Sequence, residues 1–154
     1  MLIFEKGTSS HHNEIERVLR AAFGPYVRGL GRELTPDAYD WLETAVARGD
    51  IYVAIDNAAI IGVVATSRQD GEIIINQLAV NPERQGNGIG SWLLGRMEDV
   101  ALQTSVRELS LNTAEMREDL VGFYRWHGFV IVRRGPPAHG KDAHQRVYMK
   151  KSVR

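Results

Sequence analysis

The chain has 154 residues, 44% of them hydrophobic and 25% charged, which is the size and composition of one globular domain. Its 19 basic residues balance 19 acidic ones, so the net charge gives no sign of nucleic acid or a membrane as a partner. Cysteine is absent, which excludes disulfides, cysteine-ligated zinc and a cysteine nucleophile. No segment has the character of a signal peptide or a membrane span, so we expect a cytoplasmic protein.

The N-terminal third is predicted to be mainly helical. Residues 2–5 read as a short strand, and Ser9 and Ser10 offer N-caps for a helix with an apolar stripe. The stripe consists of Ile15, Val18, Leu19, Ala22 and Phe23. A glycine-punctuated stretch over residues 24–31 is expected to be irregular. A second helix is predicted to open at Thr35-Pro36 and to close at Gly49.

The rest of the chain alternates strands with two helices. Asp56-Asn57 and Asp70-Gly71 mark hairpin turns. Strands are predicted over residues 51–55, 60–66, 72–80, 108–111, 129–133 and 146–150, and helices over residues 89–101 and 120–127. No linker or repeat divides the sequence. The order of elements predicts a single α/β domain, residues 1–154, with a mixed, largely antiparallel sheet.

The sharpest motif is a glycine-rich loop that runs from a buried strand into a helix. It reads Gln85-Gly86-Asn87-Gly88-Ile89-Gly90 and is followed by Ser91. N–H groups at a helix start have no partner within the helix and carry the positive end of its dipole. Glycine lets a phosphate approach these groups closely. The loop therefore predicts an anion site.

Three other interpretations of this loop are possible. A P-loop requires Lys-Ser or Lys-Thr after its last glycine, where this chain has Ser91-Trp92. A dinucleotide fingerprint fits Gly86 and Gly88 with Ser91 in the third place. It opens a βαβ unit, however, whereas three strands joined by short turns precede this loop. A helix start that needs glycine only for close packing is the remaining alternative.

The loop matches every fixed position of the pattern Gln/Arg-x-x-Gly-x-Gly/Ala and so resembles the acetyl-CoA-binding core of the GNAT N-acetyltransferases. The segment Phe123-Tyr124-Arg125-Trp126-His127-Gly128-Phe129 resembles the helix and strand that follow in that family. The resemblance implies the GNAT fold, with about seven strands and four helices. It also implies transfer of acetyl from acetyl-CoA directly to the primary amine of a small molecule or peptide, with no metal, and it allows a homodimer.

The resemblance assigns three roles around acetyl-CoA. Main-chain groups of Leu78, Ala79 and Val80 would pair with the pantetheine arm. Backbone amides from Gln85 to Ser91 would hold the pyrophosphate. Tyr124 would stand beside the sulfur, where a phenol that is protonated at neutral pH can donate to the departing thiolate. An N–H at the end of the strand, such as that of Val80, would stabilise the oxyanion.

The general base has no clear signature. Some family members place a glutamate where this chain has Asn112, and an amide cannot act as a base. Glu72 and Glu33 are the candidate bases. Relatives carry an asparagine seven or five residues before the tyrosine, where this chain has Arg117 and Asp119. Which of these two residues contacts CoA stays open.

The acceptor is expected between two irregular segments, residues 23–34 and 135–145. Binding residues concentrate on loops carried by a rigid scaffold, and the resemblance places both segments at the acceptor side of the cleft. Tyr26, Arg28 and His144 are the predicted substrate-binding residues. Arginines in the first segment would suit an acceptor that bears a carboxylate beside its amine.

Two alternatives follow from what the pattern lacks. His139, Asp142 and His144 have side chains that bind metals, but no fourth ligand is evident, so no metal site is predicted. The missing base favours a second function on the same fold, a non-catalytic module that binds or senses acyl-CoA. Tyr124 favours the enzyme.

Overall fold

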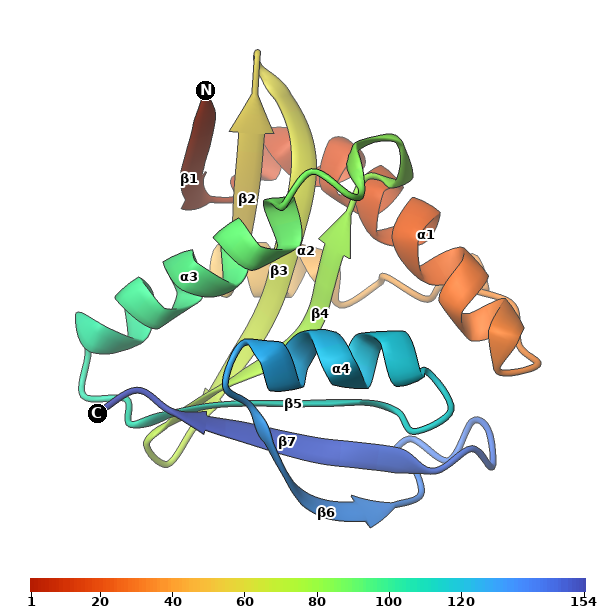
Figure 1. Cartoon of the computed structure of the whole chain (residues 1–154). Helices are drawn as coiled ribbons and strands as arrows, with labels where there is room; N and C mark the ends of the chain where they lie inside the picture. Colours follow the sequence, from red (N-terminus) through yellow and green to blue (C-terminus); the bar gives the residue numbers. More distant parts are fainter.

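Seven strands form one sheet in the computed structural model, which describes all 154 residues (Figure 1). They are β1 (Leu2–Lys6), β2 (Ile51–Asp56), β3 (Ala59–Gln69), β4 (Glu72–Val80), β5 (Glu108–Ala114), β6 (Val130–Gly135) and β7 (Arg146–Ser152). Their order across the sheet is β1-β2-β3-β4-β5-β7-β6, and β4 with β5 is the one parallel pair. The predicted mixed, largely antiparallel sheet is confirmed.

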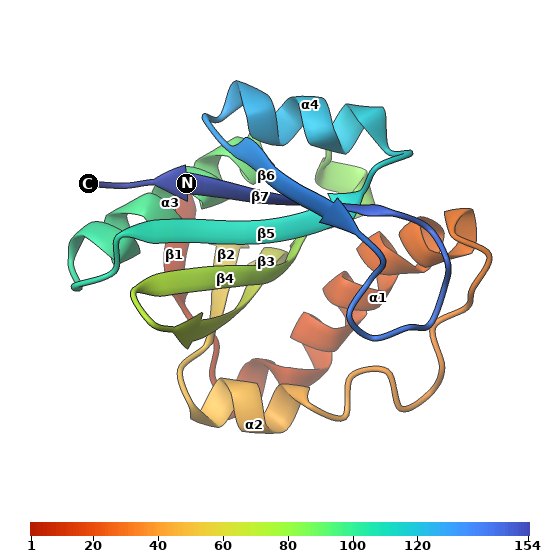
Figure 2. The same cartoon turned by 90° about the horizontal axis from the view of Figure 1, so that it is seen from below.

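Four helices cover the sheet on both faces. They are α1 (His12–Gly29), α2 (Leu42–Ala47), α3 (Ile89–Leu102) and α4 (Glu118–Trp126), with short 3₁₀ turns η1 (Ser9–His11) and η2 (Pro82–Arg84). Figure 2 shows α3 and α4 on one face and α1 and α2 on the other. Leu93, Met97 and Tyr124 pack into the core on the first face, and Ile15 and Leu19 into the core on the second. None of the helices is long and apolar enough to span a membrane.

Helix α1 is longer than the sequence indicates. The stretch expected to be irregular is helical as far as Gly29, and the helix passes through Gly24 and Pro25. Proline lacks the N–H of a regular helical hydrogen bond and usually ends a helix. Here the burial of Val27 and Leu30, 5% and 3% exposed, outweighs that preference.

Helix α2 is shorter than predicted and does not begin at Thr35-Pro36. Residues 36–41 form successive turns, and α2 begins only at Leu42. The Thr35 hydroxyl donates to Asp37 instead of capping a helix. The turns place Tyr39 in the core, where it is 3% exposed. Gly49 ends the segment with φ +75°, as the sequence indicates.

The strands β4 and β5 separate soon after they meet. Their pairing covers only residues 72–74 and 108–110. Directly beyond this, β4 carries a bulge, because Thr66 of β3 pairs with Ile75 and Ala65 pairs with Gln77, which leaves Asn76 as an extra residue. A bulge bends its strand and increases the local twist. The result is a gap between the two strands (Figure 1). The main-chain groups that face this gap have no partner in the opposite strand.

Candidate active site

A pocket of about 300 Å³ occupies the gap between β4 and β5. Its two ends are lined by different elements. We call one end the α3 side; it is lined by Val80, Gln85, Gly90, Phe123 and Tyr124. We call the other the α1 side; it is lined by Ala22, Phe23, Tyr26, Thr113 and Arg117. The pocket thus joins the glycine-rich loop to the C-terminal half of α1.

The glycine-rich loop has a backbone that side chains would strain. Gly86 and Gly88 have φ angles of +84° and +77°, in the left-handed region that favours glycine. A Cβ at either position would meet no atom within 4 Å, so the space beside them is open. The N–H groups of residues 86–91 donate to no backbone carbonyl. These free donors at the start of α3 fit a phosphate group.

The end of β4 turns alternate main-chain groups toward the pocket. The Asn81 N–H donates to the Ile61 carbonyl of β3 at 2.8 Å, and Ala79 pairs with Val63 of the same strand. Because backbone groups alternate in direction along a strand, Leu78 and Val80 point theirs into the gap. Leu78 and Val80 line the pocket, whereas Ala79 is 1% exposed in the core. Two of the three predicted main-chain partners therefore face the pocket, and Ala79 does not.

Tyr124 is a buried residue of α4 whose side chain reaches the pocket. Its ring lies 5.2 Å from that of Phe123 and 5.8 Å from that of Phe129, centroid to centroid. Burial, and to a lesser extent the neighbouring Tyr26, raise the pKa of the phenol well above its ordinary value. The uncharged form is favoured because a phenolate would lose its hydration there. The Tyr124 hydroxyl is therefore protonated at neutral pH.

Helices α3 and α4 are held together beside the loop. The Ser91 hydroxyl lies 2.9 Å from His127 Nε2, and the His127 ring lies 4.8 Å from that of Phe123. A Cβ at Gly90 would come within 3.3 Å of Phe123, so this glycine allows the close approach of the two helices. The sequence indicates no role for His127. The structure shows that it fixes the first turn of α3 against α4.

On the α1 side, Tyr26 bridges the pocket to β5. Its hydroxyl accepts a hydrogen bond from the Ala114 N–H at 2.9 Å. The guanidinium of Arg117 lies 5.7 Å from the centre of the Tyr26 ring and donates to both oxygens of Asp119, at 3.0 and 2.8 Å. The ion pair lowers the pKa of Asp119. Arg117 and Asp119 both line the pocket, and each is already paired with the other.

This geometry agrees with the comparison to protein families. A family model described as the Acetyltransferase (GNAT) family matches residues 14–129 of the chain. The chain belongs to the GNAT acetyltransferase family. Comparison with curated protein sequences finds no match.

Solved structures of several acetyltransferases have the same fold along nearly the whole chain. The PaiA N-acetyltransferase of Thermoplasma acidophilum, in complex with coenzyme A, has a TM-score of 0.79 at 18% identity, with 99% of each chain covered. Aminoglycoside 6′-acetyltransferase type Ii has a TM-score of 0.78 at 20% identity, covering 99% of this chain and 97% of its own. The ribosomal-protein-S18-alanine N-acetyltransferase of Escherichia coli has a TM-score of 0.76 at 15% identity, covering 99% and 94%. At these identities the likeness shows the fold.

Both candidate bases and two of the three predicted substrate-binding residues lie outside the pocket of this GNAT domain. The Glu72 carboxylate accepts from Lys150 Nζ at 3.0 Å and from the Ser110 hydroxyl at 3.3 Å, at the paired end of β4. Glu33 is exposed and lies 3.6 Å from Arg28. The exposed His144 is on the β6–β7 loop. Of the predicted bases and substrate-binding residues, those that do not line the pocket are Glu72, Glu33, Arg28 and His144. Of the predicted cofactor-binding residues, those that do not line it are Ala79, Gly86, Asn87, Gly88, Ile89 and Ser91.

The bulged part of β4 brings two amides to the pocket that sequence reasoning missed. Asn76 and Gln77 both line it. The Asn76 amide donates to the Ser67 hydroxyl at 3.1 Å, and the Gln77 carbonyl accepts from the Tyr39 hydroxyl at 3.0 Å. Burial raises the pKa of Tyr39 to about 12. The bulge depends on pairing with β3, so the sequence of β4 alone carries no signal for it.

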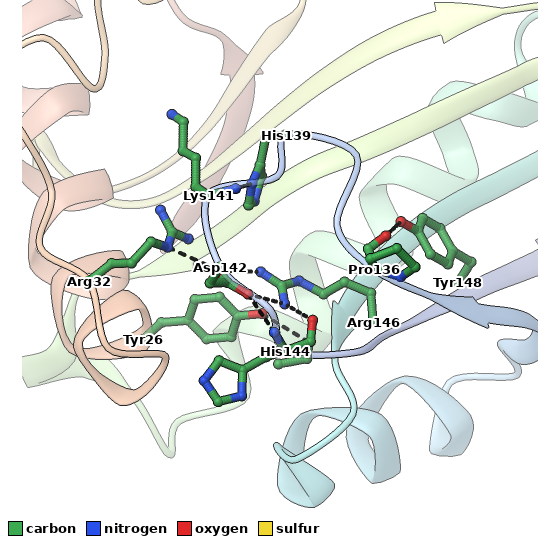
Figure 3. Close-up of polar contacts among 10 residues, drawn as sticks. Tyr26, Arg32, Pro136, His139, Lys141, Asp142, His144, Arg146 and Tyr148 are labelled. Atoms are coloured by element: carbon green, nitrogen blue, oxygen red, sulfur yellow. Dashed lines mark hydrogen bonds and ion pairs between the residues drawn. The ribbon is translucent and has the colours of Figure 1, made fainter.

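The three side chains considered as metal ligands do not form a metal site. Asp142 is paired with Arg146 and Arg32, at N–O distances of 3.0 Å (Figure 3). His139 accepts a hydrogen bond from the Lys141 N–H at 2.9 Å. No group of three histidine or acidic side chains lies close enough to hold a metal ion. Arg32, expected among the groups that grip an acceptor, is bound to Asp142 instead.

Proposed function

We propose that this protein transfers the acetyl group of acetyl-CoA directly to a primary amine. One observation carries the proposal: a single pocket is lined by Gln85 and Gly90 of the glycine-rich loop, which has free N–H groups over residues 86–91, and by the protonated phenol of Tyr124. A similar structure is described as a complex with coenzyme A, and others as N-acetyltransferases. Membership of the GNAT family supports the same reaction class.

The α3 side has main-chain groups that can bind the pyrophosphate and the pantetheine arm of coenzyme A. The pyrophosphate would accept hydrogen bonds from the N–H groups of residues 86–91, at the positive end of the α3 dipole. The amides of the pantetheine arm would pair with the main chain of Leu78 and with the Val80 carbonyl, which also accepts from Gln85 Nε2 at 3.1 Å, where β5 has moved away. The thioester would then lie in the pocket near Tyr124.

The reaction follows from the groups around that position. The amine nitrogen attacks the thioester carbonyl carbon, a C–N bond forms and the C–S bond breaks. Main-chain N–H groups of β4 in the gap, such as that of Val80, stabilise the negative charge on the carbonyl oxygen. The Tyr124 hydroxyl gives its proton to the departing sulfur and regains one from solvent.

The proton of the amine is assigned to water. Asp119 is the one carboxylate that lines the pocket, and Arg117 holds both of its oxygens. No imidazole lines the pocket, and Glu72 is paired with Lys150. We therefore propose that the amine enters as the free base or loses its proton to a water molecule in the cleft, with no dedicated protein base.

The test is a broad panel of amines with acetyl-CoA, scored by the release of free CoA thiol. Because the protein has no cysteine, a thiol reagent reports CoA without background from the enzyme. We expect at least one amine to give turnover that Tyr124→Phe reduces strongly. Thiol release that is independent of any amine, or absent with every amine class, would contradict the proposal.

The second candidate is a non-catalytic module that binds acyl-CoA. The absence of an unpaired base among the lining residues favours it. Both candidates predict that CoA raises the melting temperature of the protein. They differ in turnover, since the module would bind acetyl-CoA without acetylating any amine.

A further inference from the structure

Asp142 is the most completely bonded carboxylate outside the pocket lining. It lies in the loop between β6 and β7, and its side chain is 5% exposed. Its oxygens accept hydrogen bonds from Arg146 Nη1 and Nη2 at 3.1 and 3.0 Å, from Arg32 Nε at 3.0 Å and from the His144 N–H at 3.0 Å. Figure 3 shows both arginine side chains converging on this one carboxylate.

These bonds join segments that are far apart in the sequence. Arg32 belongs to the segment that follows α1, and Arg146 is the first residue of β7. Arg146 is also the register partner of Ala114, whose N–H bonds the hydroxyl of Tyr26. The C-terminal end of α1 is therefore tied to β5 and β7 at two points, one through Tyr26 and one through Asp142. Figure 2 shows the β6–β7 loop lying beside this end of α1.

Stability alone does not account for this arrangement. Removing charges from water costs free energy, and a buried ion pair often contributes no more than well-packed apolar side chains would. Here one carboxylate faces two arginines, of which Arg146 is 3% exposed. Burial, and after it the positive charges of Arg32 and Arg146, lower the pKa of the neighbouring His139. What the carboxylate provides is a fixed geometry, because each of its bonds has a defined direction.

We propose that Asp142 is a positioning residue for the amine acceptor. It fastens the β6–β7 loop to the segment after α1, and so holds Tyr26 and the α1 side of the pocket at a fixed distance from β5. This inference rests on the proposed acetyl transfer. On this inference, the β6–β7 loop and the segment after α1 form one rigid unit on the acceptor side of the pocket. The sequence alone indicates two independent loops.

The kinetic test compares Asp142→Asn, Arg32→Gln and the double variant with the wild type. The matched control is Glu98→Gln, which removes a long-range ion pair with Lys151 on the far side of the sheet. We expect each single variant to raise the acceptor KM about tenfold, because a displaced wall misplaces the amine, while kcat and the acetyl-CoA KM change less than about twofold. The double variant should resemble the singles, since both remove one connection. Glu98→Gln should change none of these values.

Amide hydrogen exchange tests the connection itself, whether or not an acceptor has been found. In Asp142→Asn, exchange should quicken both over residues 136–145 and over residues 30–34. Unchanged exchange over residues 30–34, or an unchanged acceptor KM in an active variant, would overturn the inference. If Asp142→Asn does not fold, Arg32→Gln decides, because it leaves the Asp142–Arg146 pair intact. A wild type without turnover on any amine would instead refute the proposed function, and hydrogen exchange would still decide the connection.

Discussion

The two sides of the pocket are built in different ways. The α3 side offers backbone N–H groups at the start of a helix and on a strand, and two of its glycines have φ angles that other residues rarely adopt. The α1 side is built from side chains, and the ion pair between Arg32 and Asp142, which are 110 positions apart, joins two of its segments. Backbone recognition needs glycine at fixed spacing, which a sequence displays. Recognition by paired side chains needs partners that only the fold brings together.

The two sides also differ in the stability that a substitution is expected to cost. Free N–H groups at a helix start are fixed by the helix and need no side chain to orient them. Arg117 and Asp119 have side chains that are 37% and 64% exposed, and such surface pairs contribute about 0 to 1 kcal/mol. Substitution of either residue of this pair should therefore cost little stability.

The largest effect on the comparison between the two sides is expected from a substitution at Tyr124, which lies where the two sides of the pocket meet. Tyr124→Phe keeps the ring packing and removes only the proton donor. We expect kcat to fall about a hundredfold, within the range for loss of a general acid, with acetyl-CoA affinity nearly unchanged. Single-turnover kinetics should be measured, so that slow product release does not hide the effect. Wild-type rates in this variant would show that the thiolate leaves without help from Tyr124.

A smaller effect is expected at Gly88, which tests the backbone character of the α3 side. Gly88→Val places a branched side chain where a phosphate would bind and strains a left-handed residue. We expect the Kd for CoA to rise about thirtyfold, the loss of about one charge-assisted hydrogen bond of about 2 kcal/mol. Calorimetric titration of each protein with CoA measures this Kd.

The control for Gly88→Val is Gly71→Val in the β3–β4 turn. Gly71 has φ +79° and open space beside it, so the same substitution imposes the same kind of strain far from the pocket. Both variants should lose similar stability, and only Gly88→Val should lose affinity. Equal losses of affinity would mean that the glycine-rich loop serves folding alone.

On the α1 side, substitutions of Tyr26 and Arg28 test whether the acceptor contacts this segment inside the pocket or at the surface. Tyr26 lines the pocket, whereas Arg28 points to Glu33 at the surface. Tyr26→Ala should raise the acceptor KM about tenfold through the loss of an aromatic contact of about 1 to 1.5 kcal/mol. Arg28→Ala should change it less than twofold, and steady-state kinetics with the acceptor varied will show which holds. The reverse order would place the acceptor outside the pocket.

The smallest expected effect is on the shape of the pH profile of kcat/KM. Amines react as the free base, so kcat/KM should rise with pH. Because the pKa of Tyr124 is raised above its ordinary value of about 10, the proton donor persists and no descending limb should appear below about pH 10. Initial rates in overlapping buffers test this. A fall in rate above about pH 8 would indicate a different acid.

The sequence predicts the elements of the α3 side well. The strand over residues 72–80, the following helix and the glycine-rich loop between them all follow from local patterns. The family pattern also singles out Tyr124. What the pattern could not show is the direction of each main-chain group, because the bulge at Asn76 sets it. Ala79 was therefore included although it faces β3.

The α1 side was predicted less well, for a physical reason. Gly24-Pro25 is a local signal for an irregular segment, and the burial of Val27 overrides it. The ion pairs of Arg32 and Glu72 depend on partners more than seventy positions away, Asp142 and Lys150. No local spacing encodes such a choice. The predicted acceptor residues thus included Tyr26, which lines the pocket, and His144, which does not.

The division between the two sides can be tested directly by amide hydrogen exchange with and without CoA. If coenzyme A lies between β4 and β5 with its pyrophosphate on α3, then protection should appear at residues 86–91 and at Leu78 and Val80. The loop over residues 136–145 and the segment over residues 30–34 should exchange as before. Protection confined to those two segments, with residues 86–91 unchanged, would contradict the account, since coenzyme A would then bind on the α1 side.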